Sequence, residues 1–265
     1  MIKILTYAAA ATSAVALLTG GAFAQQPAQS PEASAEALSE VPSRVQAHVS
    51  EIWEPVPRTV ATPEDAPPSD AIVLFDGTSM DSWIMAAEDG GPANWPVSDG
   101  IVSVGSGDIV TADSFCDVQL HIEWRTPAEI EGFDGQDRGN SGIMFHRQYE
   151  VQVLDSVDNL TYVNGQAASI YKQHPPLVNA SRGPGEWQTY DIVFESPIFA
   201  EDGRLRKPAY MTVFHNGVLV QNHAELAGVT EYIGYPTYSP HDCGPILLQD
   251  HNADVSYRNI WLRPL

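Results

Sequence analysis

The strongest constraint on the fold is a stretch of eight residues in which apolar and polar side chains alternate without a break. In residues 118–125 (VQLHIEWR) every even-numbered residue is apolar and every odd-numbered residue is polar. Successive side chains of a β-strand point to opposite faces of a sheet, so this period of two predicts a strand with one buried face. The expected core residues are Leu120, Ile122 and Trp124. The polar face is expected to carry His121, Glu123 and Arg125.

Strand signals recur along residues 70–265, whereas helical periodicity is nearly absent. The dipeptide Asn216-Gly217 lies between two apolar segments and predicts a two-residue type I′ hairpin. Many short strands without intervening helices favour an antiparallel sandwich of two sheets. Besides residues 118–125, strands are expected at residues 72–75, 100–104, 142–146, 149–154, 188–195, 210–215, 218–222, 246–251 and 255–262.

The first 24 residues have the features of a secretory signal peptide. Lys3 supplies a positive start, residues 8–18 form an apolar run, and Ala22-Phe23-Ala24 is a small-x-small cleavage site before Gln25. An uncleaved anchor is the alternative, but the run is shorter than the roughly 20 apolar residues that span a bilayer. We expect a periplasmic or secreted protein whose mature domain is not inserted in the membrane.

The composition divides the rest of the chain into a tether and one domain. Residues 25–67 are rich in Ala, Pro, Ser and Glu, which predicts a flexible tether with one short helix near residues 33–52. Residues 68–265 are expected to form a single domain. The 34 acidic residues outnumber the 13 basic ones, giving a formal net charge of -21. Such a surface repels nucleic acid, whereas a neutral saccharide is indifferent to it.

Cys116 and Cys243 are the two cysteines of the chain. An exported protein can form a disulfide. Both cysteines precede predicted strands, and these strands would begin close together if they were parallel neighbours or lay at one rim of the sandwich. Two separate buried thiols are the alternative. Neither cysteine has a nearby Cys or His at the spacing of a zinc site.

Eight short motifs follow one another in residues 70–265: LFDGT (74–78), LHIEWRTP (120–127), GNSGI (139–143), YEVQVLD (149–155), NASR (179–182), GEWQTYD (185–191), FHNGV (214–218) and LQDH (248–251). In this order they resemble the 3-keto-disaccharide hydrolase family. The resemblance implies an all-β fold, a concanavalin-like jelly-roll β-sandwich of two antiparallel sheets whose concave face holds sugars. It also implies an enzyme that acts on glycosides whose sugar carries a ketone at carbon 3.

Three of the predicted strands carry rows of polar residues, because residues two apart on a strand share a face. The rows are Glu150 with Gln152, Gln249 with His251, and His121 with Glu123 and Arg125. If the strands are neighbours in the concave sheet, the rows form one polar floor for a saccharide. Solvated outer-face side chains are the alternative. The expected substrate-binding residues are Gln152, Gln249, Lys172, His121 and Asn140.

The 3-keto substrate implied by the resemblance allows a simple mechanism. The ketone acidifies the hydrogen on carbon 2, so one base can start elimination of the aglycone from carbon 1, and water then adds back. The reaction needs a base, a positive group beside the enolate oxygen and an acid for the leaving group. Our candidates are Glu150 or His251 as base, Arg125 or Lys172 as enolate stabiliser, and Glu123 as acid or orienting residue.

The same residues allow three other interpretations. A divalent metal ion could replace the cationic side chain, with His121, Glu123, Glu150 and His251 as candidate ligands, although the spacing itself shows no metal site. A conventional glycosidase needs two carboxyl groups roughly 5–5.5 Å or 6.5–9.5 Å apart, and Glu123 with Glu150 on adjacent strands would supply them. A non-catalytic carbohydrate-binding module is the third possibility, but the polar rows are richer in Glu, His and Arg than in aromatic residues.

Overall fold

The computed structural model describes residues 43–87 and 90–265. The predicted signal peptide, residues 1–24, lies outside the described residues, as does the first part of the tether. Helix α2 (Ser43–His48) falls within the region where a short helix is expected. The compact unit that holds the strands runs from Thr59 to Leu265, so it begins before the predicted boundary at residue 68. No helix in the described part of the chain has the length and apolar character needed to cross a bilayer.

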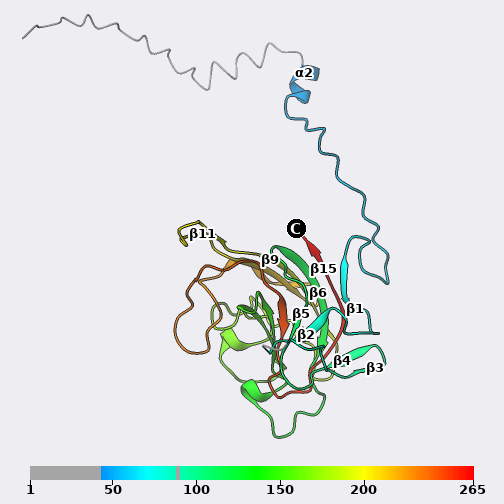
Figure 1. Ribbon diagram of the computed structural model, residues 1–265, viewed down its shortest axis with the longest axis vertical. Coiled ribbons are helices and arrows are strands. Elements are labelled where there is room, and N and C mark those ends of the chain that lie inside the picture. Colours follow the sequence, from blue (N-terminus) through cyan, green and yellow to red (C-terminus); the bar gives the residue numbers. More distant parts are fainter. Residues whose placement is uncertain (1–42, 88–89) are drawn as a thin grey trace, which may run out of the picture. The chain divides into compact units, whose positions relative to one another are not determined.

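The strands pair into two antiparallel sheets (Figure 1). Sheet A contains β1 (Ile72–Phe75), β3 (Val97–Ser98), β4 (Ile101–Ser103), β6 (Val118–Arg125), β9 (Gln188–Glu195), β12 (Tyr210–His215), β13 (Val218–Glu225) and β15 (Ser256–Pro264). Their order is β13-β12-β9-β6-β15-β4-β3, and β1 pairs with β15 on the edge opposite to β6, beyond β4 along that edge. Figure 1 shows the red strand β15 running alongside β6 and β1.

Sheet B lies on the other side of the core. It contains β2 (Trp83–Met85), β5 (Ile109–Thr111), β7 (Ser141–Phe145), β8 (Tyr149–Val153) and β14 (Ile246–Leu248), in the order β2-β5-β14-β7-β8. A separate small hairpin joins β10 (Ile198–Phe199) to β11 (Leu205–Lys207). Short 3-10 helices, η1 (Gly135–Asp137) and η2 (Val163–Gly165), lie in the loops before β7 and after β8.

Alternating side chains of both sheets build the core. Burial along β6 alternates without exception, and Leu120, Ile122 and Trp124 are almost completely buried. Sheet B presents Val151 and Val153 to the same core, and its Phe145 ring stacks on Phe194 of sheet A with centroids 4.7 Å apart. The predicted all-β sandwich of two antiparallel sheets, the concanavalin-like jelly roll, is confirmed.

The predicted hairpin is also confirmed. Asn216 and Gly217 have φ values of 51° and 79°, as a type I′ turn requires, and His215 pairs with Val218 across them. The strand predicted at residues 246–251 ends at Leu248 instead. There Asp250 leaves the ladder because its backbone N–H donates to Asp108 and its carboxylate accepts from Gly107 N–H.

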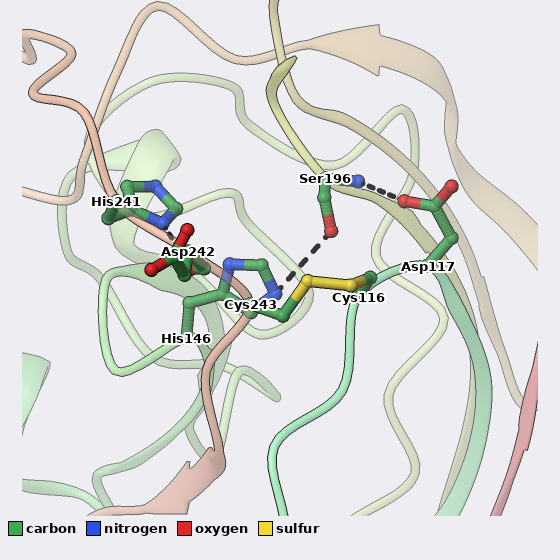
Figure 2. Close-up of a disulfide and its surroundings, with 7 residues drawn as sticks. All are labelled: Cys116, Asp117, His146, Ser196, His241, Asp242 and Cys243. Carbon is green, nitrogen blue, oxygen red and sulfur yellow. Dashed lines mark hydrogen bonds between the residues drawn. A yellow bond between two sulfur atoms is a disulfide. The ribbon is translucent and has the colours of Figure 1, made fainter. Parts of the chain in front are cut away.

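A disulfide joins Cys116 to Cys243 (Figure 2), with Cα atoms 4.7 Å apart. Cys116 precedes β6 of sheet A and Cys243 precedes β14 of sheet B, and the neighbouring Phe115 forms a β-bridge with Gly244. The predicted bond is therefore present. The two strands are not neighbours in one sheet but begin at one rim of the sandwich, where the bond ties sheet A to sheet B.

We predict that replacing both cysteines with serine lowers the free energy of unfolding by about 2–5 kcal/mol, because the bond closes a long loop in the unfolded chain. Urea unfolding of the oxidised wild type and the double serine variant measures the difference. Wild type treated with reductant is the matched control and should behave like the variant. Equal midpoints for oxidised and reduced protein would contradict a stabilising role.

Candidate active site

A cavity of about 230 Å³ opens on the face of sheet B that points away from sheet A. The register pairs Met144 with Glu150 and Gly142 with Gln152, so these residues share the face opposite to the buried Ile143 and Val151. The volume is below the roughly 300–1,000 Å³ of sites for drug-sized ligands, which suits one small unit such as a sugar ring. The lining residues are Asn140, Met144, Glu150, Gln152, Tyr171, Thr230, Tyr232, Gln249 and His251.

Gly142 makes room for this cavity at the middle of the floor. A Cβ atom at this position would lie 2.7 Å from Glu150 Oε1, which is closer than side-chain packing allows. Glycine inside a strand often marks such a close approach. The missing side chain lets the Glu150 carboxylate lie across β7 between the neighbouring strands.

The backbone of Glu150 is fixed on both sides. Its N–H donates to Thr230 Oγ1 at 3.0 Å, and its carbonyl accepts from Tyr171 N–H at 3.1 Å. The side chain differs, because the described chain offers its carboxylate no hydrogen bond. Burial raises the pKa of Glu150 from its ordinary value of 4.5 to about 8. A carboxyl group perturbed in this way at a cavity floor is a candidate for proton transfer.

Gln152 and Asn140 form a second part of the floor. Gln152 Nε2 donates to Asn140 Oδ1 and to Gln136 Oε1, both at 3.2 Å, while Asn140 Nδ2 donates to the Gln136 carbonyl. Gln152 Oε1 is buried and has no hydrogen-bond partner among the described residues. A hydroxyl group of a bound ligand would satisfy this acceptor, since buried polar groups are normally paired.

A buried ion pair supports this network from behind. Arg138 binds the carboxylate of Asp155 and also donates to the carbonyls of Val157 and Asp158. The Asp155 N–H in turn donates to the Arg138 carbonyl. The pair joins the loop before β7 to the loop after β8, so it positions the segments that carry Asn140 and Gln152.

Gln249 and His251 line the cavity, as expected, from the segment that follows β14. Gln249 N–H donates to the Gly142 carbonyl at 3.0 Å, which continues the β7 register beyond the end of the strand. Its side chain therefore falls in line with Gly142 and Gln152. The described residues form no hydrogen bond with the side chains of Gln249 and His251, so both can act as donors or acceptors toward a ligand.

The third polar row lies elsewhere, so the prediction of a single floor is wrong in this part. His121, Glu123 and Arg125 belong to sheet A and point away from sheet B, because the alternate residues of β6 fill the core. His121 bonds Asp191 at 2.7 Å, and Glu123 accepts from Arg258 at 2.6 Å. Arg125 covers the Trp187 ring at 4.8 Å. These contacts make the row a paired outer face of the sandwich.

Lys172 also differs from its expected place. Its ammonium donates to the Tyr232 carbonyl at 2.6 Å and lies 4.5 Å from the centroid of the Tyr232 ring and 5.7 Å from that of Tyr162. Lys172 therefore contacts Tyr232 and Tyr162 beside the cavity and is not among the residues that line it. Lys and Arg side chains are absent from the described lining residues of the cavity.

The four candidate metal ligands are divided between the two outer faces of the sandwich. Glu150 and His251 line the cavity, whereas His121 and Glu123 lie on the far side of sheet A, so the four cannot bind one ion. Within the described residues, no group of three or more His, Cys, Asp or Glu side chains is arranged to hold a metal.

Several cavity residues escape the sequence analysis. Met144, Thr230 and Tyr232 line the site. Gly142, within a predicted strand, was a usable signal, because strand glycines often accompany close approach. Thr230 and Tyr232 had no such signal, since they lie in a loop far along the chain from β8.

Comparisons with known proteins show the family of this chain. Residues 70–263 match the family described as the 3-keto-alpha-glucoside-1,2-lyase-like domain. A 3-keto-disaccharide hydrolase of Bacteroides thetaiotaomicron is 25% identical over 239 residues, which cover 73% of this chain and 78% of that protein.

Two solved structures of Parabacteroides distasonis proteins are similar to this chain. A Parabacteroides distasonis protein, provisionally named a glycosyl hydrolase, is 49% identical with a TM-score of 0.78, covering 82% of this chain and 96% of that one. A second protein of that organism, with the same provisional name, is 21% identical with a TM-score of 0.54 over 74% of this chain and 94% of its own, and shows the fold. The relatives support an enzyme that acts on carbohydrates, and the match over residues 70–263 shows that this chain belongs to the 3-keto-alpha-glucoside-1,2-lyase-like domain family.

Proposed function

We propose that this protein cleaves the glycosidic bond of 3-keto-glycosides, including 3-keto-disaccharides, by elimination and hydration. The observation that carries the proposal is the Glu150 carboxylate, which is buried at the cavity floor without a hydrogen-bond partner in the described chain. A carboxylate held in this way is a strong base toward a carbon acid, because water does not solvate its charge. The family and the Bacteroides relative support the 3-keto substrate class.

The cavity supplies the other requirements of the reaction. Gln152 Oε1 would accept a hydrogen bond from a sugar hydroxyl. The amide of Gln249 and the imidazole of His251 are available to donate to the enolate oxygen that forms at carbon 3. Hydrogen-bond donors arranged around a developing negative charge stabilise the transition state without further reorganisation.

A conventional two-carboxylate glycosidase fits the cavity less well. Glu150 contributes the one carboxyl group among its described lining residues. Glu123 lies on the far face of sheet A, and Asp155 is paired with Arg138. Neither carboxyl group can therefore pair with Glu150 at the separation of roughly 5–9.5 Å that a retaining or inverting glycosidase needs.

Export through the predicted signal peptide is part of the proposal. The Cys116–Cys243 bond supports it, since disulfides persist in oxidising compartments. N-terminal sequencing of the protein from its native host tests this point: a chain that begins at Gln25 agrees with export, and an intact Met1 start contradicts it.

We predict that Glu150→Gln lowers kcat/KM for a 3-keto-glucoside by roughly 10²- to 10⁴-fold, because the variant keeps the shape of the side chain but not the base. The matched control is Glu123→Gln on the far face, which should retain activity. Wild-type turnover in D2O should place deuterium at carbon 2 of the released sugar. An active Glu150→Gln enzyme would remove Glu150 from this role, and products without deuterium would count against elimination.

The pH dependence of the reaction separates a base from an acid at position 150. A base must be ionised, so kcat/KM should rise by close to tenfold per pH unit up to about pH 8 and then level off, given the raised pKa of Glu150. An acid would give the opposite slope, with activity falling above that pH. Initial rates from pH 5.5 to 9.5, with stability checked at each pH, decide between the two.

The same carboxyl group should leave a mark on stability. Its folded pKa of about 8 exceeds the ordinary 4.5, so the native state binds more protons than the unfolded state between these values, and stability falls as pH rises through this window. Above pH 8, Glu150→Gln should be more stable than wild type by up to roughly 5 kcal/mol, and the difference should vanish near pH 4. Urea unfolding at pH 5, 7 and 9 measures it.

Glu123→Gln is again the control, and its expected change in stability has the opposite sign. Burial acts to raise the pKa of Glu123, but hydrogen bonds from Asn259 and Arg258 outweigh burial and hold that pKa below its ordinary value. Removing this charge should therefore reduce stability at neutral pH. A Glu150→Gln variant that is destabilised at pH 9 would contradict the burial of an unpaired carboxylate.

A further inference from the structure

Tyr171 lies directly opposite Glu150 on the cavity wall. The segment 168–171 adds to the free edge of β8 like a short strand: Gln152 N–H donates to Ser169, Tyr171 N–H donates to Glu150, and Val151 forms a bridge with Ile170. Ile170 shares the buried face with Val151, so Tyr171 shares the cavity face with Glu150. Directly opposed residues on antiparallel strands have Cβ atoms roughly 4.5–5.5 Å apart.

A second tyrosine completes a pair with Tyr171. The hydroxyl groups of Tyr171 and Tyr162 lie 2.6 Å apart, and 38% of Tyr162 is exposed. The Lys172 ammonium lies 5.7 Å from the Tyr162 ring centroid. Either hydroxyl of this pair can be the donor, so a negative charge on Tyr171 would accept a charge-assisted hydrogen bond from Tyr162.

We propose that Tyr171 is the catalytic acid that protonates the departing glycosidic oxygen, and that Tyr162 is a positioning residue that stabilises the resulting phenolate. This inference rests on the proposed elimination at Glu150. The cavity places a base and a phenol side by side, as the hydrogen on carbon 2 and the oxygen on carbon 1 are side by side in the substrate.

The protons and electrons balance over the whole reaction. Glu150 takes the proton from carbon 2, and the electrons of that bond form the enolate of the ketone. The enolate electrons then form the double bond between carbons 1 and 2, the bond from carbon 1 to the glycosidic oxygen breaks, and that oxygen takes the Tyr171 proton. During hydration the Tyr171 phenolate takes a proton from water as its oxygen bonds to carbon 1, and Glu150 returns a proton to carbon 2.

Other lining residues are poorer acids for this step. Asn140, Gln152 and Gln249 carry amides, and Thr230 carries an aliphatic hydroxyl, which is a weaker acid than a phenol. His251 and Tyr232 are the competing donors, since an imidazole and a second phenol also line the cavity. Burial raises the pKa of Tyr171, so its hydroxyl keeps its proton at neutral pH.

The test compares leaving groups in the Tyr171→Phe variant. For 3-keto-glucosides with an alkyl or sugar aglycone, whose oxygen must be protonated as it leaves, we expect kcat/KM to fall roughly 10²- to 10⁴-fold. For the 4-nitrophenyl 3-keto-glucoside, whose aglycone leaves as a stable anion, the loss should be at most about tenfold. Tyr162→Phe should show the same dependence on the leaving group with a smaller loss of kcat/KM. Tyr232→Phe keeps the bond between its backbone carbonyl and Lys172, and its kcat/KM should show no dependence on the leaving group.

Proton abstraction gives a second readout that a merely structural role would not move. Alkyl substrate recovered from Tyr171→Phe in D2O should gain deuterium at carbon 2 faster than it is cleaved, because Glu150 still acts while the leaving group is retained. An equal loss for all leaving groups, or His251→Gln showing the leaving-group dependence in place of Tyr171→Phe, would overturn the assignment. If wild type cleaves no 3-keto-glucoside at all, the proposed function itself fails.

Discussion

The packing of sheet A against sheet B decides where polar chemistry can occur in this protein. A strand has two faces, and in both sheets one face is committed to the shared apolar core, where β6 supplies Leu120, Ile122 and Trp124 and β8 supplies Val151 and Val153. The polar residues between them must then project outward in opposite directions. Glu123 and Glu150 are thereby kept on opposite sides of the molecule. This separation leaves Glu150 as the one carboxyl group among the described lining residues of its cavity, as the proposed reaction with a single base requires.

Much of the fold could be predicted because it depends on local rules. Alternation along residues 118–125 gave the strand and its buried face, and Asn216-Gly217 gave the hairpin, since both signals act within a few residues. The assignment of polar rows to a common floor failed because it depends on which strands are neighbours. Which strands become neighbours follows from the packing of the whole chain and cannot be read from the residues in the row of His121 and Glu123.

The candidate site was predictable only in part, for the same reason. Glu150, Gln152, Gln249 and His251 were found together because they lie on or beside strands with clear alternation. Tyr171 and Thr230 contact the backbone of Glu150 from loops, and the hydrogen bonds that hold them are long-range. The outward row looked similar in composition, but its charges are paired with Asp191 and Arg258, whereas the buried Glu150 carboxylate has no hydrogen-bond partner among the described residues. Isolation of the charge, more than the residue type, distinguishes the site.

The segment 168–171 has a consequence beyond the cavity. Strand β8 is the last strand of sheet B, and its outer edge would otherwise present unpaired N–H and carbonyl groups to other molecules. Hydrogen bonds from Gln152 to Ser169, from Ala168 to Gln152 and from Tyr171 to Glu150 cover this edge. The segment that carries Tyr171 therefore also guards against edge-to-edge association between copies of the protein. Changes that loosen this segment would expose the edge of a strand that can pair with another chain and aggregate.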